Sequence, residues 1–152
     1  MTYEELLKEA DSMGLVVKEK SLQSGDGRIF NNKIAIRQDI PTETEKSCVL
    51  AEELGHHHTS VGNILNMEDL SNRKQERQAR FWGYNKLIGL TGIVNAFESG
   101  CQSAYEAAEF LEVTVEYLQE CIDCYRDKYG ICTEIDNYII YFIPNLAVMA
   151  KV

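Results

Sequence analysis

Two glutamates and a histidine at helical spacing are the strongest chemical signal in the sequence. Glu52, Glu53 and His56 lie in the segment LAEELGHHH. On a helix, positions 52 and 56 project from one face one turn apart, so that a carboxylate and an imidazole can reach the same metal ion. Glu53 is displaced by about 100° around the axis, beside that pair. The segment therefore predicts a metal site with an adjacent general base.

The arrangement follows the H-E-x-x-H motif of zinc peptidases, with Glu52 in place of the first histidine. In that motif the ion polarises the scissile carbonyl and lowers the pKa of water. The intervening glutamate takes the proton from the water and later delivers it to the leaving amine. A carboxylate can bind Zn²⁺ through oxygen. Because it is a harder ligand than imidazole, it weakens zinc binding or favours Mn²⁺ or Fe²⁺.

A third ligand is expected from a second helix. The segment KQERQARFWGYNKL offers Glu76, while Ala79 and Trp82 continue its apolar face at three-residue spacing. If the two helices run antiparallel, Glu76 faces the first helix, and the small Ala79 permits a close approach. A solvated surface helix also fits these residues. Because three successive histidines cannot all face one way, His57 or His58 must point elsewhere.

Capping residues and hydrophobic spacing indicate the helices that must position these groups. Helix starts are expected at five positions: Thr2, Thr42, Ser71, Ser103 and Thr114. The helix that starts at Thr42 is expected to run to about Val61, and a further short helix is expected over 91–97. The chain is thus predicted to be mostly helical.

Short strands are expected near both ends of the chain. The segments 15–19, 28–30 and 33–36 predict a small antiparallel sheet, because they alternate or are separated by turn residues. The tail, 137–143, is rich in Ile, Tyr and Phe and predicts a terminal strand. Together with the helices, these strands indicate an α+β fold.

Composition excludes several classes of function. The chain has 152 residues and a formal charge of −9, which argues against nucleic-acid binding because phosphate contacts need clustered Lys and Arg. No apolar run reaches the roughly 20 residues that span a bilayer. The N-terminus lacks the pattern of a secretory signal. Five cysteines without such a signal predict reduced thiols and a cytoplasmic protein, and Cys121 and Cys124 fit a helical pattern better than a redox or zinc motif.

The order of these motifs resembles the ImmA/IrrE family of metallo-endopeptidases, which bacteria, prophages and integrative elements mostly encode. The matching segments are the strand 32–36, the helix 45–56 and the Glu76, Ala79, Trp82 pattern. They cover roughly residues 15–90. The resemblance implies a zincin-like domain over 1–100, and a helical, winged-helix-like part with a terminal strand over 101–152, packed on the first.

The resemblance also implies a zinc-dependent endopeptidase that cleaves a protein substrate, a helix-turn-helix repressor that keeps a phage or other mobile element silent. Carried onto this chain, Glu53 is the general base, and His56 and Glu76 are metal ligands. Glu52 occupies the first ligand position, where family members usually have histidine. It retains a side chain that can bind a metal.

Two alternatives remain open. The Glu52 substitution also fits a catalytically inactive member that binds a repressor or another regulator without cleaving it. The segment 103–129 has a helix-turn-helix pattern, which suggests a DNA-binding regulator. However, its second helix carries Glu116, Glu120 and Asp123 before its first arginine, and phosphates would repel these carboxylates.

Overall fold

The computed structural model describes residues 1–60 and 69–152, except for the side chains of Ser60 and residues 69–72. The described residues form two compact units, Met1–Gly83 (unit 1) and Tyr84–Val152 (unit 2). The boundary falls inside a helix, seventeen residues before the boundary expected at residue 100. The division into domains at residue 100 stays a prediction. The sequence-based end of the second helix, Val61, lies outside the described residues.

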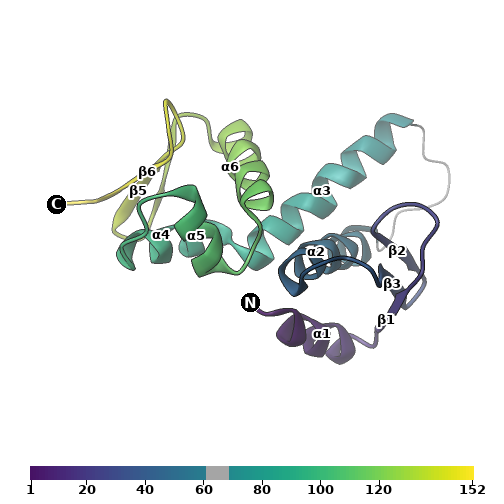
Figure 1. Ribbon diagram of the computed structural model, residues 1–152. Coiled ribbons are helices and arrows are strands. Elements are labelled where there is room, and N and C mark those ends of the chain that lie inside the picture. The colour runs from purple at the N-terminus through teal and green to yellow at the C-terminus, as the bar shows by residue number, and fades with distance from the viewer. Residues whose placement is uncertain (61–68) are drawn as a thin grey trace. The chain divides into compact units, whose positions relative to one another are not determined.

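Unit 1 consists of a helix, a small sheet and two longer helices, as Figure 1 shows. Its elements are α1 (Tyr3–Ser12), β1 (Val16–Lys20), β2 (Gly27–Phe30), β3 (Lys33–Arg37), α2 (Glu43–Ser60) and α3 (Asp69–Leu87), of which α3 continues into unit 2.

Local capping starts the first two helices where the sequence predicts. The Thr2 hydroxyl accepts a hydrogen bond from the Glu5 backbone N–H, and the Glu5 carboxylate accepts one from the Thr2 N–H. Thr42 caps α2 by accepting from the Glu45 N–H at 3.1 Å. The prediction for the next helix is wrong, because α3 begins at Asp69 and Ser71 lies inside it. Each such cap is worth about 1 kcal/mol.

The first sheet is mixed rather than antiparallel. The order is β1-β3-β2, with β3 in the centre. β2 and β3 form the expected antiparallel pair, with Ile29 opposite Ile34. β1 runs parallel to β3, with Val17 opposite Ile34. The local sequence pattern predicts where each strand lies but not which strand it pairs with. The parallel pairing of β1 with β3 was therefore not predicted. β2 is an edge strand and lies against α2.

Apolar side chains on α2 hold unit 1 together. Leu50 and Leu54 are fully buried, where α2 packs against α1 on one side and against β2 and β3 on another. Leu6 of α1 and Ile36 of β3 are also fully buried. Each of these side chains contributes roughly 1.5–3 kcal/mol by leaving water. α2 is therefore a rigid support for the polar groups that it also carries.

Unit 2 contains three further helices followed by a second sheet. Its elements are α4 (Gly89–Glu98), α5 (Ala104–Leu111), α6 (Val115–Tyr129), β4 (Cys132–Ile135), β5 (Tyr138–Tyr141) and β6 (Ala147–Ala150). Ser103 and Thr114 cap α5 and α6 as predicted, each accepting from the backbone N–H three residues on. The α+β, mostly helical fold class is confirmed.

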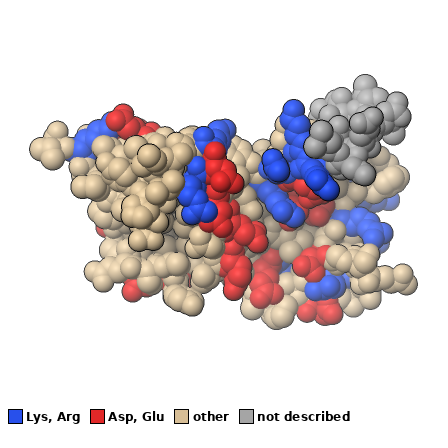
Figure 2. All heavy atoms as spheres, turned by 90° about the horizontal axis from the view of Figure 1, so that it is seen from above, with Lys and Arg blue, Asp and Glu red and all other residues tan. Residues whose placement is uncertain are grey.

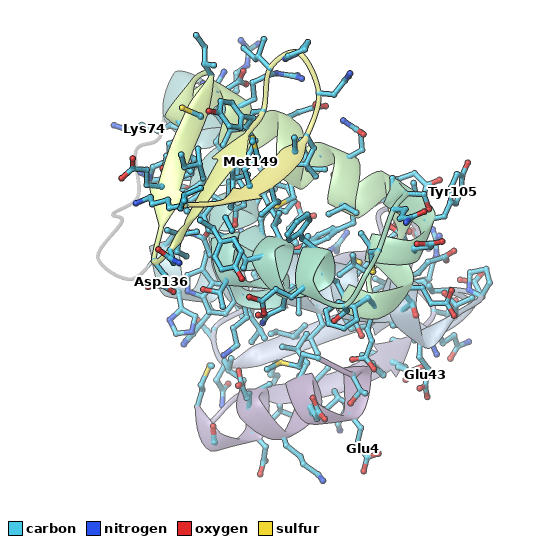
Figure 3. All side chains as sticks on the ribbon, turned by 90° about the vertical axis from the view of Figure 1, so that its left-hand side faces the viewer. Glu4, Glu43, Lys74, Tyr105, Asp136 and Met149 are labelled. Carbon is cyan, nitrogen blue, oxygen red and sulfur yellow. The ribbon has the colours of Figure 1, made fainter. Side chains whose placement is uncertain are left out.

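The second sheet is larger than the single terminal strand that the sequence suggested. β5, the expected strand, pairs antiparallel with β4 on one side and β6 on the other. The two additional strands, with the sequences CTEI and AVMA, lack the run of Ile and Tyr that marks β5. Figure 3 shows Tyr105 on α5 and Met149 on β6, two large side chains that are exposed in unit 2.

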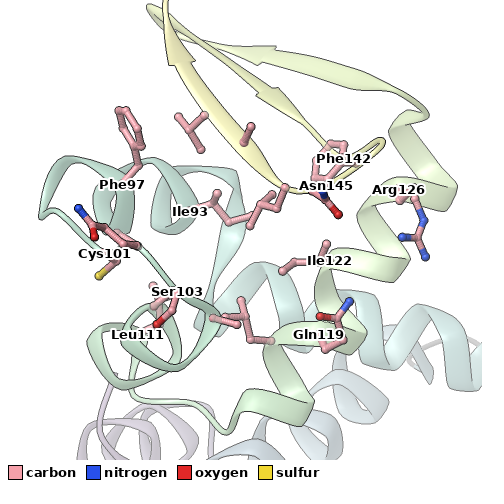
Figure 4. Close-up of a pocket in the computed structure, with 18 of the residues that line it drawn as sticks. Ile93, Phe97, Cys101, Ser103, Leu111, Gln119, Ile122, Arg126, Phe142 and Asn145 are labelled. Atoms are coloured by element: carbon pink, nitrogen blue, oxygen red, sulfur yellow. The ribbon is translucent and has the colours of Figure 1, made fainter.

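A cavity of about 460 Å³ lies within unit 2, between the helices and the turn that joins β5 to β6. Figure 4 shows apolar side chains such as Ile93 and Ile122 on its walls, with the amides of Gln119 and Asn145 among them. None of the residues that the sequence assigns to metal binding or catalysis lines this cavity.

None of the five cysteines forms a disulfide bond in the structure, and Cys121 is fully buried on α6. None of the helices in the described part of the chain is both long and apolar enough to cross a membrane.

Candidate metal centre

Three side chains from two helices come together in unit 1. Glu52, His56 and Glu76 each place one ligand atom so that all three lie within 4.8 Å of one another. His56 Nε2 is 3.3 Å from Glu76 Oε1. Glu52 and His56 come from successive turns of α2, and Glu76 comes from α3, as predicted. These are the only described residues that form a group of this kind.

Close contact between two small residues allows the helices to approach. Gly55 of α2 lies against the backbone of Ala79 in α3, and a Cβ at position 55 would overlap the Ala79 carbonyl group. Ala79 itself is fully buried. The sequence predicted that the small Ala79 would permit this approach. The structure shows that Gly55, which has no side chain, is the small residue on the facing helix. The approach is what brings side chains on α3 within reach of Glu52 and His56.

Glu53 occupies a separate position beside this group. Its side chain is only 8% exposed and extends toward the start of β2. A Cβ at Gly27 would lie 3.0 Å from both the Cγ and the Oε1 of Glu53. Gly27 therefore leaves the space that the Glu53 carboxylate fills. The sequence analysis missed this role, because Gly27 was visible only as part of a turn.

Burial and neighbouring charges raise the pKa of Glu53. Desolvation is the largest cause, followed by the negative charges of Glu52 and Glu76, and together they raise the pKa from 4.5 to about 7. A carboxyl group with such a pKa changes between acid and base near neutral pH, which is what general acid–base catalysis requires. Perturbed carboxyl groups of this kind are concentrated at functional sites.

An arginine that the sequence analysis did not consider contacts the first ligand position. Arg80 Nε is 3.5 Å from Glu52 Oε1, and both side chains are partly exposed. Arg80 follows Glu76 by four residues, so both project from the same side of α3. That spacing is the signal that could have identified it. Figure 2 shows basic side chains interspersed with acidic ones on one face of the molecule, despite the net negative charge.

The two other histidines point elsewhere, as three successive residues on a helix must. His58 is exposed, and its ring stacks on Trp82 of α3 with centroids 4.5 Å apart. The His57 ring meets that of His58 edge-on. Neither belongs to the group formed by Glu52, His56 and Glu76.

The donor set suits a divalent cation. Two carboxylates and one imidazole are known zinc ligands, and the carboxylates equally suit harder ions such as Mn²⁺. Two ligands of one tetrahedral zinc ion lie roughly 3.4 Å apart, given bonds of about 2.0–2.2 Å. The 3.3 Å between His56 and Glu76 fits that value.

Comparison with known proteins identifies the family. A family model described as the IrrE N-terminal-like domain, a peptidase family, matches residues 10–122. The chain belongs to this family. The match covers about three quarters of the sequence and includes all four candidate residues, which lie between positions 52 and 76. No curated protein and no solved structure matches the chain significantly.

Membership in the IrrE N-terminal-like family confirms the resemblance found in the sequence. It supports a metallopeptidase type of function, and with it a protein substrate and a metal cofactor. The group of Glu52, His56 and Glu76 is a place where a metal can bind.

Proposed function

We propose that the chain is a metal-dependent endopeptidase in which Glu52, His56 and Glu76 hold one divalent cation and Glu53 is the general base. The observation that carries this proposal is the convergence of three ligand atoms from α2 and α3 beside a buried carboxyl group whose pKa is about 7. A cation bound there would supply Lewis-acid chemistry, polarising the scissile carbonyl group and acidifying water.

Glu53 is suited to move a proton during peptide hydrolysis. Near neutral pH its carboxylate can accept a proton from the attacking water, and the resulting carboxylic acid can then donate it to the nitrogen of the departing amine. The packing of Glu53 against Gly27 holds the carboxylate in place and excludes bulk water from one side. Fixed placement of this kind supports catalysis because the reacting groups need not be reoriented.

The edge strand β2 offers a place for the substrate. β2 is one of the two outer strands of its sheet, and Gly27 at its start contacts Glu53. An extended peptide that pairs with such an edge gains main-chain hydrogen bonds. A substrate held in this way would present its backbone near Glu53. We assign the substrate to the helix-turn-helix repressors of phages or other mobile elements, in line with the resemblance seen in the sequence.

The test combines metal analysis with cleavage. Purified protein is stripped with a chelator, reloaded separately with Zn²⁺, Mn²⁺ or Fe²⁺, and mixed with the helix-turn-helix repressors that are encoded in the same genome. We expect about one ion per chain and a discrete cleavage product. His56→Ala and Glu76→Ala should lose both the ion and the cleavage. Glu53→Gln should keep the ion and lose activity by a factor of about 10²–10⁴.

Glu43→Gln is the matched control, because Glu43 is an exposed glutamate at the start of the same helix. It should change neither the metal content nor the cleavage. Absence of a bound ion under every metal condition would refute the proposal.

One observation favours a second candidate, an inactive regulator. The contact between Arg80 and Glu52 balances part of the negative charge of the group without any metal. A chain that binds a repressor, and neither binds metal nor cleaves, would fit this candidate. The DNA-binding alternative has less support, because α6 carries Glu116 in its first turn and its basic residues only in its last turn.

A further inference from the structure

Arg80 and Glu52 form the second of two cross-helix pairs at the candidate metal centre. The first is His56 with Glu76, at 3.3 Å, and the second is Glu52 with Arg80, at 3.5 Å. α2 contributes Glu52 and His56 four residues apart, and α3 contributes Glu76 and Arg80 at the same spacing. Because residue 52 pairs with 80 and residue 56 with 76, the two helices run antiparallel here, and Gly55 contacts Ala79 between the pairs. This antiparallel packing places Arg80 beside Glu52, a proposed ligand.

The contact between Arg80 and Glu52 changes the net charge around the proposed ligands. With a neutral imidazole, Glu52, His56 and Glu76 carry two negative charges. A set in which histidine takes the first position would carry only one. The guanidinium group of Arg80 is always protonated and contributes one positive charge next to Glu52. The four side chains together therefore carry a single negative charge, equal to that of two imidazoles and one carboxylate.

We infer that Arg80 is a specificity-determining residue, which competes with the cation for the Glu52 carboxylate and thereby sets the affinity and choice of the metal. The inference rests on the proposed function, since it requires a cation at this group. While Arg80 contacts Glu52, that carboxylate is a weaker ligand, and the centre behaves more like one built from histidine and a single carboxylate. A centre with two fully available carboxylates would favour Mn²⁺ relative to Zn²⁺.

The test measures metal affinity rather than catalysis. Dissociation constants for Zn²⁺ and Mn²⁺ are determined on the full chain by competition with a chromophoric chelator. Arg80→Gln removes the charge and keeps a long polar side chain. We expect it to tighten binding of both ions by about fivefold, because an exposed ion pair no longer holds the Glu52 carboxylate away from the cation. The gain should be larger for Mn²⁺ than for Zn²⁺.

Three further variants separate competition for Glu52 from other effects. Arg77→Gln removes an equal charge from an exposed position on α3 and should change affinity by less than about twofold. Arg80→Lys keeps the charge and should preserve the affinity of the natural chain. In a Glu52→Gln background, Arg80→Gln should change the metal affinity by less than about twofold, because the carboxylate for which Arg80 and the cation compete is absent.

Salt provides a readout that a purely structural role of Arg80 would not move. At an ionic strength of about 1 M, the difference between Arg80→Gln and the natural chain should shrink, because screening weakens exposed charge interactions. If the natural chain binds about one ion, loses it with His56→Ala, and yet Arg80→Gln behaves like Arg77→Gln, the inference is overturned while the proposed function stands. If no variant binds a divalent ion, the proposed function fails, and this inference fails with it.

Discussion

Burial raises the pKa of a titratable group in each unit of the molecule, with different consequences. In unit 2, Tyr125 is fully buried and its hydroxyl donates to Asn85 Oδ1 at 2.6 Å. Desolvation raises its pKa above the usual range and also raises the pKa of Cys121 to about 12. Both groups are therefore neutral throughout the physiological range. In unit 1, desolvation and two neighbouring carboxylates bring the pKa of Glu53 to about 7.

The difference shows that a raised pKa indicates function only when the raised value lies near physiological pH. The phenol of Tyr125 is an ordinary buried hydrogen-bond donor, and its neutrality costs no free energy. The carboxyl group of Glu53 is buried without becoming permanently neutral, and its ionisation lowers the stability of the fold. Such a cost is expected at sites selected for chemistry rather than for stability.

The largest effect should come from filling the space between α2 and α3. Gly55→Ala places a methyl group on the backbone of Ala79, which cannot rotate away as a side chain can. We expect a loss of about 3 kcal/mol or more in the free energy of unfolding, with metal binding lost, as measured by urea denaturation and metal analysis. Gly92→Ala in α4 is the control, because its Cβ meets only side chains, Leu111 Cδ2 at 3.1 Å and Ile88 Cγ2 at 3.8 Å. Equal destabilisation by the two substitutions would show that the α2–α3 contact has no special role.

A second prediction concerns the pH dependence of stability in metal-free protein. The folded state binds the Glu53 proton more tightly than the unfolded state, because the pKa is about 7 when folded and 4.5 otherwise. The free energy of unfolding should therefore fall as pH rises from 4.5 to about 7, by about 3 kcal/mol in total, and then level off. Urea denaturation with a chelator, from about pH 5 to about pH 8, measures this fall.

Glu53→Gln should remove this pH dependence and make the chain more stable than the natural one above neutral pH, since the amide never ionises. Glu43→Gln should leave the dependence in place. A natural chain whose stability rises across this range would contradict the burial of an ionisable Glu53.

A smaller effect is expected at Gly27. In Gly27→Ala the new methyl group would lie 2.8 Å from Val49 Cγ1 and 3.0 Å from Glu53 Oε1, so the Glu53 side chain must shift by a few tenths of an ångström. We expect kcat to fall by about tenfold, with metal content unchanged. Arg28→Ala, at the exposed neighbouring position on β2, should leave kcat unaltered. Equal losses in both variants would mean that any change in β2 disturbs the reaction.

The smallest effect should appear in unit 2. Tyr125→Phe removes the hydroxyl that Asn85 accepts from, and Asn85 is exposed and can bond to water instead. We expect a loss of about 1 kcal/mol in the free energy of unfolding, the same at about pH 5 and about pH 8. If the loss of unfolding free energy in Tyr125→Phe depended on pH, Tyr125 would titrate in this range as Glu53 does, and the difference between the two groups would not hold.

The helices were predictable because their signals are local. Thr2, Thr42, Ser103 and Thr114 each cap a helix through a hydrogen bond to a residue three positions on, which the sequence displays directly. The spacing of Glu52 and His56 on α2 is a local signal of the same kind. Glu76 was proposed from its place beside the apolar face that Ala79 and Trp82 mark on the next helix, and the family resemblance agreed. The structure places Glu76 beside His56.

The remainder depends on which distant segments meet, and local pattern does not contain that information. The parallel pairing of β1 with β3, the contact of Gly27 with Glu53 and the contact of Arg80 with Glu52 all join separate elements. A turn glycine and one arginine in a basic run have many ordinary explanations in a sequence. Their proximity to the candidate centre appears only when the chain is folded.

The contact of Gly55 with Ala79 has a consequence for how this chain can evolve. Because the contact leaves no room for a methyl group, a lineage that abandoned proteolysis would still be selected for glycine at position 55, simply to fold. Glu53 would not be retained by selection for folding, because its ionised carboxylate is unfavourable to bury. Mutation would replace it by residues whose burial costs less free energy. Under the proposed function, descendants that keep the glycine but lose the glutamate would be expected to keep the fold without the peptidase activity.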